Sequence, residues 1–530
     1  MSRTKTKQPN RYTQKLTGLL PKWAEERYIV PALLLLATIT RFATIAKASI
    51  WHDEGFTMML IARNPVEIWA GSGRDVHPPL FYELLHFWTN LFGRSELAAR
   101  SMSAVAGLVT IYVCYLLVKR YFAKTTGYLV LLILAVAPFL VRYSQEARMY
   151  GVLGLFLITG TYALLRALEP GDQKKWWVVY VVMMAAGLYT HYFTALAMMA
   201  QWIYLLSLTP IHAWRLGKTP WLSARWWLAN IAIVVLWIPW LPSFYGQISR
   251  GQGISWIPKT TAYTLPNNLW QNLTFTDGRQ LPQLLYWIVP ALILLGAVWV
   301  TWLLRRSKPQ IKMLFFYTFV PIVLTIVVSI IKPVYQDRYL VFAANGIYML
   351  LGITLHQLIA RHRATGLAAL VLVVGISLVG VINVGRQASH SMGKVGDHVV
   401  ANYKPGDEMV SAELYTYFDF SYYCTDVCID SRNRQDEKGM MTAVYPAPWS
   451  QLRLNTTGGR PNGYGESALL YDRADQIYVD DWAVIRPASG RVWLIGKPGD
   501  KPYWKATPAN WTQVDSFVTN SSEARLYQVQ

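Results

Sequence analysis

The sequence predicts a mostly α-helical, polytopic membrane bundle that carries a small mixed α/β domain at its C-terminal end. Three observations support this fold class. Apolar residues make up 53% of the 530 residues, and runs of about twenty of them recur, which is the length of helix that crosses a hydrocarbon core. Basic residues collect in the short segments between these runs. Residues 387–530 have no comparable run and are rich in turn-forming residues.

The N-terminal segment, residues 1–27, is basic and precedes the first apolar run. Seven Lys and Arg stand among the first 28 residues, against only Glu25 and Glu26. A secretory signal peptide also begins with a basic segment, but the run that follows here has no small-residue cleavage site. We therefore interpret residues 1–27 as a cytoplasmic tail and the following run as a retained first span.

The transmembrane domain is expected at residues 28–386, with eleven spans. The basic loops "KRYFAK", "EPGDQKK", "HAWRLGKTPWLSAR", "RRSKPQIK" and "ARHRATG" fall on the same side as the N-terminus. The positive-inside rule places that side in the cytoplasm. The predicted spans are 28–48, 98–118, 125–141, 149–167, 176–190, 193–209, 227–245, 284–304, 313–331, 339–359 and 366–385.

The first outer loop, residues 49–97, is long and amphipathic. Its segments "EGFTMMLIARNPVEIWAG" and "HPPLFYELLHFWTNLFG" are too interrupted to span, and we expect helices that lie at the membrane surface. An odd number of spans places the C-terminal domain, residues 387–530, on the outer side as well. There "DEMVSA", "RVWLIGK" and "EARLYQVQ" predict strands, whereas "ELYTYFDFSYY" fits a helix or a strand.

Charge and cysteine usage narrow the class further. The net charge is +20, but residues 387–530 carry 14 basic and 17 acidic residues. The basic excess therefore belongs to the membrane domain, where loop topology explains it, and nucleic acid is not an expected partner. Cys424 and Cys428 lie on the oxidising side, where a disulfide and two free thiols are both open. Cys114 lies within a span, where a packing role is expected.

Polar clusters follow the outer ends of the predicted spans. A helical bundle would bring these ends toward a single outer cavity, although they are far apart in the sequence. The clusters are His52-Asp53-Glu54, "DVHPPLFY" with Asp75, His77 and Tyr82, "RYSQEARMY" with Arg142, Gln145, Glu146, Arg148 and Tyr150, "THYF" with His191 and Tyr192, and "KPVYQDRYL" with Lys332, Tyr335 and Arg338.

As a set in this order, these motifs resemble the GT-C superfamily of membrane glycosyltransferases over roughly residues 28–345. The nearest patterns are bacterial proteins of the protein O-mannosyltransferase and aminoarabinose-transferase type. The resemblance implies transfer of a sugar from a polyprenyl-phosphate carrier on the outer face, with inversion at the anomeric carbon. It also implies that Asp53 is the general base. The acceptor, which the sequence leaves open, is a lipid, a glycan or a protein.

The residue types suit this chemistry independently. An alcohol needs a base before it attacks, which assigns catalysis to Asp53, with Glu54 and Glu146 as further candidates. A phosphate leaving group needs cations, and the fork of Arg matches phosphate oxygens. Arg142, Arg148, Lys332 and Arg338 are available for this role. The other substrate-binding candidates are His52, Asp75, His77, Tyr82, Gln145, Tyr150, His191, Tyr192 and Tyr335.

Several alternatives stay open at the level of sequence. Asp53 or Glu54 fits a helix N-terminus, and the proline pair after His77 fits a helix start. A divalent metal is possible, because Asp53, Asp75, His77, Glu146 and His191 offer oxygen and nitrogen ligands. The rival functions are a membrane transporter or lipid flippase and a non-catalytic cell-surface assembly protein. Transporters tend to place polar residues near the midplane, whereas the acidic residues here cluster on one outer face.

Overall fold

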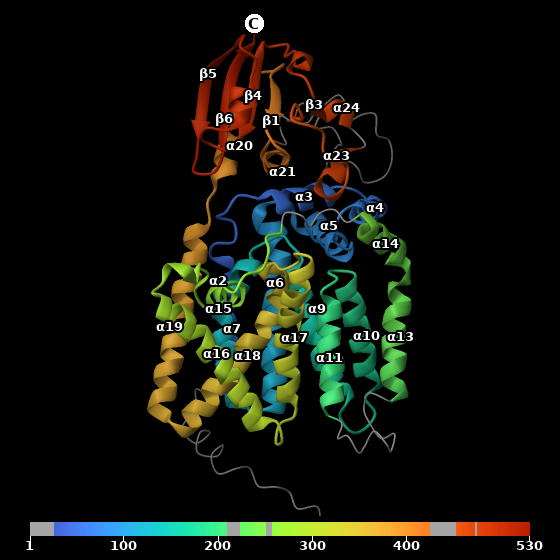
Figure 1. Ribbon diagram of the computed structural model, residues 1–530, viewed down its shortest axis with the longest axis vertical. Coiled ribbons are helices and arrows are strands. Elements are labelled where there is room, and N and C mark those ends of the chain that lie inside the picture. The colour runs from blue at the N-terminus through green and yellow to red at the C-terminus, as the bar shows by residue number, and fades with distance from the viewer. Residues whose placement is uncertain (1–25, 209–222, 251–256, 425–451, 472–473, 530) are drawn as a thin grey trace, which may run out of the picture.

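The protein consists of a helical bundle with a smaller domain stacked on one end. A computed structural model describes residues 26–208, 223–250, 257–424, 452–471 and 474–529. In Figure 1 the bundle occupies the lower part, the C-terminal domain stands above it, and the short helices α3, α4 and α5 lie between the two. The site described below is built where these three layers meet.

Helices occupy all eleven positions at which the sequence predicts spans. One predicted span is broken: α7 (Lys124–Ala135) and α8 (Pro138–Ser144) meet at a bend of 60°, because Pro138 cannot continue the hydrogen-bond ladder of α7. The other ten positions hold α2 (Glu26–Phe42), α6 (Glu96–Tyr121), α9 (Tyr150–Ala167), α10 (Lys174–Leu188), α11 (Thr194–Ser207), α13 (Ala224–Trp237) continued by α14 (Leu241–Arg250), α16 (Gln283–Leu304), α17 (Gln310–Ile331), α18 (Val341–Arg361) and α19 (Arg363–Gln387).

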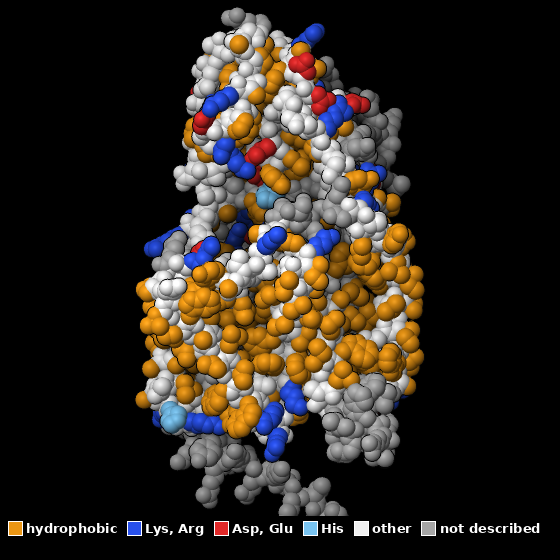
Figure 2. All heavy atoms as spheres, viewed as in Figure 1, with side chains coloured by type: hydrophobic (Ala, Val, Ile, Leu, Met, Phe, Trp, Pro, Cys, Tyr) orange, Lys and Arg blue, Asp and Glu red, His pale blue; other side chains and the backbone are white. Residues whose placement is uncertain are grey.

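The count of eleven spans is not confirmed. Among the described residues, seven helices are long and apolar enough to cross a membrane, or eight if the bent α7–α8 pair is one span. Helices α2, α10 and α11 have 17, 15 and 14 residues and fall below that length. On the face shown in Figure 2, apolar side chains form a broad band across the bundle, with Lys and Arg side chains near its two edges. The membrane character of the bundle is therefore supported, whereas the exact count of spans stays a prediction.

The first outer loop folds into the helices α3 (His52–Leu60), α4 (Pro65–Arg74) and α5 (Leu80–Phe92). The start of α4 is fixed by a capping box, in which the Asn64 side chain accepts from the backbone N–H of Glu67 at 3.0 Å and the Glu67 carboxylate accepts from that of Asn64 at 3.2 Å. Pro65 occupies the first turn, where its missing N–H costs nothing. A further short helix, α15 (Thr264–Thr274), packs against α8 and α19.

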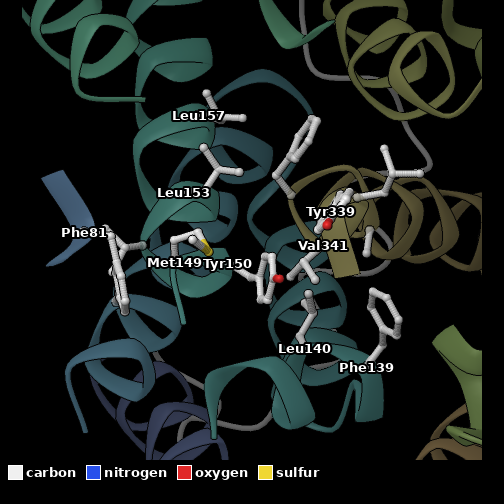
Figure 3. Packing of buried hydrophobic residues seen from close by; sticks show 14 of the residues in the cluster. Phe81, Phe139, Leu140, Met149, Tyr150, Leu153, Leu157, Tyr339 and Val341 are labelled. Carbon is white, nitrogen blue, oxygen red and sulfur yellow. The ribbon is translucent and has the colours of Figure 1, made fainter. Parts of the chain in front are cut away.

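Buried apolar side chains pack beneath the layer formed by α3, α4 and α5. Figure 3 shows how residues of α8, α9 and the start of α18 gather there, with Phe81 of α5 at one side. Tyr150 and Tyr339 lie with their ring centroids 6.3 Å apart. Because the side chains that flank this cluster in sequence include Arg148 and Arg338, the packing fixes the positions of charged groups at the surface of the core. The labelled members are Phe81, Phe139, Leu140, Met149, Tyr150, Leu153, Leu157, Tyr339 and Val341.

The C-terminal domain is a mixed α/β domain with a six-stranded sheet of order β3-β2-β1-β4-β6-β5. The neighbours β3-β2-β1-β4 are parallel, and β4-β6-β5 are antiparallel. The predicted strands are confirmed as β1 (Glu408–Ser411), β4 (Arg491–Gly496) and β6 (Glu523–Val529), and "ELYTYFDFSYY" is resolved as the helix α21 (Leu414–Tyr423). Sequence patterns missed β2 (Leu452–Asn455), β3 (Tyr478–Val479), β5 (Trp511–Val518) and the helix α20 (Ser391–Asn402).

The cysteine prediction is tested only in part. Cys424 is buried at the end of α21 and is disulfide-bonded, but Cys428 lies outside the described residues, so their pairing stays a prediction. Cys114 is a free, buried thiol in α6, in agreement with a packing role. The predicted basic tail also lies almost entirely outside the described part of the chain.

Candidate active site

A cavity of about 650 Å³ lies between the bundle, the outer helices and the C-terminal domain. Seven of the residues predicted from the sequence line it: His52, Asp53, Asp75, His77, Arg148, Tyr150 and Arg338. They come from α3, the segment before α5, the segment between α8 and α9, the first residue of α9, and the turn that precedes α18. The prediction that these distant motifs share one cavity is therefore met for this group.

Asp53 lies in the first turn of α3 and is 5% exposed. Its Oδ1 lies 2.9 Å from Nε2 of His52, and its Oδ2 lies 3.3 Å from Nη1 of Arg338 and 3.8 Å from Nε of Arg148. A helix N-terminus adds further partial positive charge. The carboxylate is therefore surrounded by positive charge on the floor of the cavity.

These neighbours decide the protonation of Asp53. Burial alone would raise its pKa, but Arg148, the hydrogen bond with His52 and Arg338 outweigh burial and hold the pKa well below its usual range. Asp53 is therefore ionised at neutral pH while both guanidinium groups face it. A carboxylate in this state is a weak base until a competing anion draws the arginines away.

Arg148 and Arg338 are fixed on different elements. Arg148 is buried, and its Nη1 donates to Thr57 Oγ1 at 3.0 Å and to the backbone carbonyl of Asp53 at 3.2 Å. Arg338 belongs to a 3₁₀ turn, Asp337–Leu340, directly before α18, and its guanidinium lies 5.4 Å from the ring centroid of Trp51. Two arginines held in this way present a preorganised site for phosphate oxygens.

Glu54 points away from the cavity. The Glu54 side chain is fully buried. Its carboxylate accepts hydrogen bonds from Arg100 Nε at 2.9 Å and from Arg100 Nη2 at 2.6 Å. It also accepts from the backbone N–H of Ala147 at 2.7 Å. Both carboxylate oxygens are thus engaged in holding α3 against α6 and against the segment that carries Arg148. This placement favours a structural role over the catalytic one predicted from sequence.

Asp75 and His77 line the cavity, and His191, which does not line it, packs against His77. His77 Nδ1 lies 3.2 Å from Asp75 Oδ2, and the His77 and His191 ring centroids lie 5.6 Å apart. Burial, His77 and Arg148 lower the pKa of His191 well below its usual value, so this ring is neutral. Its Nδ1 accepts from the backbone N–H of Phe193 at 3.1 Å, which leaves the proton on Nε2.

The residues present do not fit a metal site of three protein ligands. Among the residues that the structure describes, no three His, Cys, Asp or Glu side chains converge as such a site requires. Asp75 and His77 already bond to one another, and Asp53 faces cations. No step of the chemistry below is routed through a metal.

Glu146 lies outside the cavity with its neighbours Arg142 and Gln145. Glu146 Oε1 pairs with Arg142 Nη2 at 2.8 Å, and its Oε2 is buried and has no hydrogen-bond partner among the described residues. Burial raises the pKa of Glu146, and Arg142 offsets part of that effect. Gln145 Nε2 donates to the carbonyl of Arg41 at 2.9 Å. Arg142 and Gln145 instead line a smaller cavity of about 140 Å³ beside α2 and α19.

The remaining predicted residues do not line the main cavity. The Tyr82 hydroxyl, 3.4 Å from Arg148 Nη1, supports that arginine from behind. The Tyr192 hydroxyl accepts from Trp240 Nε1 at 2.8 Å. Tyr335 donates to Asp337 Oδ1 at 2.8 Å, and Lys332 is exposed at the end of α17.

Sequence analysis missed the wall that the C-terminal domain contributes. Tyr415 and Asp419 are four residues apart in α21, a spacing that places both on one helical face and could have flagged them. Leu414 begins the same helix, and the other cavity-lining residues of this domain come from the segment after β2, which includes a 3₁₀ turn, and from the end of β4, where no comparable local signal exists. The residues in question are Leu414, Tyr415, Asp419, Pro461, Asn462, Tyr464, Gly465, Ser467 and Lys497.

Comparisons with known proteins agree with the glycosyltransferase resemblance noted in the sequence. Residues 76–240 match the family model described as dolichyl-phosphate-mannose-protein mannosyltransferase. ArnT from Cupriavidus metallidurans in the apo state superposes with a TM-score of 0.64 at 14% identity, covering 94% of this chain and 97% of ArnT. The resemblance to the GT-C glycosyltransferases is therefore confirmed. The family match begins beyond Asp53, so it does not itself bear on that residue.

Two further relatives extend the comparison. A polyprenol-phosphate-mannose–protein mannosyltransferase from Corynebacterium glutamicum is 27% identical over 169 residues, which span 29% of this chain and 32% of the relative. The apo oligosaccharyltransferase of Archaeoglobus fulgidus superposes with a TM-score of 0.53 at 10% identity, covering 90% of this chain and 70% of its own. At these identities the solved structures establish a shared fold and nothing finer.

Proposed function

We propose that this protein is a membrane glycosyltransferase that moves a sugar from a polyprenyl-phosphate carrier to an acceptor hydroxyl. The observation that carries the proposal is the buried Asp53 between Arg148 and Arg338 on the floor of a large cavity. The matched family and the C. glutamicum relative are described by mannosyl transfer from dolichyl- or polyprenol-phosphate-mannose to protein. ArnT has also been seen bound to undecaprenyl phosphate, and that structure superposes with a TM-score of 0.57.

The donor phosphate is the ligand of the two arginines in this proposal. Asp53, Arg148 and Arg338 together carry one surplus positive charge, which matches the single negative charge of a sugar–phosphate diester. The diester competes with Asp53 for Arg338, whose guanidinium is the less buried of the two. Binding of the donor thereby removes part of the charge that depresses the pKa of Asp53.

The transfer step follows from that exchange. The acceptor oxygen forms a bond to the anomeric carbon while the bond from that carbon to the phosphate oxygen breaks, and the electron pair stays on the phosphate. The proton of the acceptor hydroxyl moves to Asp53. The leaving phosphate gains a second negative charge, which strengthens its pairing with Arg148 and Arg338 as the reaction proceeds. A single displacement of this kind inverts the configuration at the anomeric carbon.

The charge distribution supports a site on the outer face. Under the positive-inside rule, the end of the bundle that carries "RRSKPQIK" and "ARHRATG" is cytoplasmic. The cavity and the C-terminal domain lie at the opposite end of the bundle (Figure 1). A transporter or flippase is the weaker candidate, because the charged groups that line the cavity lie at one end of the bundle and beneath a folded domain rather than near the midplane.

The test uses purified protein in nanodiscs and a panel of undecaprenyl-phosphate donors carrying mannose, glucose or 4-amino-arabinose. Envelope extract supplies the acceptor, and mass spectrometry follows release of undecaprenyl phosphate. We expect one donor to be consumed with a matching mass added to an acceptor. If the wild type bound none of the donors and released undecaprenyl phosphate from none of them, the proposed function would be contradicted.

A further inference from the structure

The C-terminal domain closes over the cavity instead of standing apart from it. Residues of α21, of the segment after β2 and of the end of β4 line the same space as Asp53 and Arg338. The wall formed by Tyr415, Asp419 and Lys497 therefore faces whatever the arginines hold.

This wall is fixed to the floor by close packing of α21 on α3. A side chain at Gly55 would collide with the backbone carbonyl of Phe418, so the glycine lets the two helices touch backbone to backbone. Phe56 and Phe418 pack edge to face with centroids 5.8 Å apart. The Tyr423 hydroxyl accepts from the backbone N–H of Ile50 at 2.8 Å. The residue after the Asp53-Glu54 pair thus joins the two layers.

Asp419 is the residue of this wall that has an unsatisfied hydrogen-bond acceptor in the described part of the chain. Its Oδ1 is buried and has no hydrogen-bond partner in the described part of the chain, although the side chain lines the cavity. A buried carboxylate oxygen without a donor is energetically unfavourable, and few such atoms persist in folded proteins. A molecule that brings a hydroxyl donor into the cavity would satisfy it.

The contact between Tyr415 and His52 places Oδ1 of Asp419 beside the reacting centre at Asp53. The two rings lie with centroids 4.7 Å apart, and His52 is itself bonded to Asp53. Tyr415 is 43% exposed and offers an apolar ring face, while Lys497 lies 5.8 Å from the centroid of that ring. An aromatic face next to a carboxylate matches a sugar ring, which presents apolar C–H groups on its faces and hydroxyl groups at its edge.

We propose that Asp419 and Tyr415 of the C-terminal domain bind the sugar of the donor and determine which sugar is accepted. This inference rests on the proposed function, because it places the donor phosphate at Arg148 and Arg338. The sugar is bonded directly to that phosphate, so it extends from the floor toward the α21 wall. Asp419 accepts a hydrogen bond from a sugar hydroxyl, and the Tyr415 ring covers one face.

The test compares two ligands on the full-length protein in nanodiscs: undecaprenyl phosphate, and whichever undecaprenyl-phosphate sugar of the mannose, glucose and 4-amino-arabinose panel the wild type binds most tightly. Asp419→Ala should weaken binding of the sugar-bearing ligand about 10- to 100-fold, because a sugar hydroxyl would lose its hydrogen-bond partner inside the cavity. Its affinity for undecaprenyl phosphate should change less than about twofold. Tyr415→Ala should show the same selectivity, and Asp500→Ala, an exposed carboxylate of the same domain, should change neither.

Equal affinities of wild type and both variants for the sugar-bearing ligand would overturn the inference and leave the proposed function standing. So would an equal loss for the two ligands. Failure of the wild type to bind either ligand would overturn the proposed function and the inference with it. Thermal unfolding of each variant shows whether it is folded, and Tyr415→Ala carries the test if Asp419→Ala is not.

Discussion

Glu54 and Arg100 form a buried, two-pronged ion pair that joins α3 to α6. Arg100 Nε donates to Oε1 at 2.9 Å and Nη2 donates to Oε2 at 2.6 Å, with both side chains at most 2% exposed. The other donors of Arg100 reach the backbone carbonyls of Ile45, Ala48 and Ser49 at 2.8 to 2.9 Å. The pair therefore holds the chain that leads from the first span into the site.

Glu54→Gln should unfold more easily than the wild type, with little change in the chemistry of the folded fraction. Removing one partner of a buried pair leaves an uncompensated charge, which costs about 3–5 kcal/mol. Thermal unfolding in detergent measures this loss, and Asp172→Asn, at an exposed pair with Lys174, is the matched control. An unchanged unfolding temperature with lost donor turnover would instead restore Glu54 to the catalytic group.

Arg338→Ala should weaken binding of undecaprenyl phosphate about 10- to 100-fold, because a charge-assisted hydrogen bond is lost. Arg338→Lys keeps the charge but loses the planar fork, so its affinity for undecaprenyl phosphate should lie between those of the wild type and Arg338→Ala. The control is Arg361→Ala at the opposite end of α18, which should bind normally. A folded Arg338→Ala protein with wild-type affinity would exclude this arginine from the phosphate site.

The orientation of the chain can be tested by cysteine labelling. Ser307 and Ser521 are both exposed, on opposite ends of the molecule. With the basic loops inside, a membrane-impermeant maleimide added to sealed cells should label Ser521→Cys and leave Ser307→Cys unlabelled until the membrane is opened. The reverse pattern would place the cavity in the cytoplasm.

The titration of Asp419 should appear in the stability of the protein. Burial raises its pKa to about 8, with His52 and Lys497 lowering it and Glu54 and Asp53 raising it. An unfolded Asp has a pKa near about 3.9, so the folded protein binds more protons between these values, and the contribution of Asp419 to stability falls as pH rises from about 4 to 8. The unfolding temperature of Asp419→Asn should therefore gain on that of the wild type from pH 5 to pH 8. A constant difference would contradict this assignment.

Much of the bundle was predictable because hydrophobic length is a local property. Each apolar run became helical, and residues from four of the five motifs line one cavity. The break at Pro138 was missed, since an apolar run of 17 residues looks like a single span whether or not a proline bends it. The span count is unconfirmed at α2, α10 and α11, where the helices are shorter than the apolar runs that predict them.

The site was predicted less evenly. Asp53 and Glu54 are neighbours in sequence, but successive residues on a helix point about 100° apart, so one faces the cavity and the other faces Arg100. Which of the two does so depends on α6, which the local sequence does not reveal. Asp419 and Tyr415 were missed because their role depends on how a separate domain docks on α3, through a contact that involves Gly55.

In the proposed reaction Asp53 takes the proton of the acceptor hydroxyl, and single-turnover transfer by Asp53→Asn measures that role. The Asn side chain is nearly isosteric but cannot take up a proton at neutral pH. General-base catalysis contributes a factor of ~10²–10⁴, so turnover should fall by that much, while donor affinity, measured on the same sample, should persist or increase because Arg148 and Arg338 are released. Near-normal turnover in a folded Asp53→Asn sample with normal donor affinity would contradict the account and move the search for the base to other carboxylates of the site.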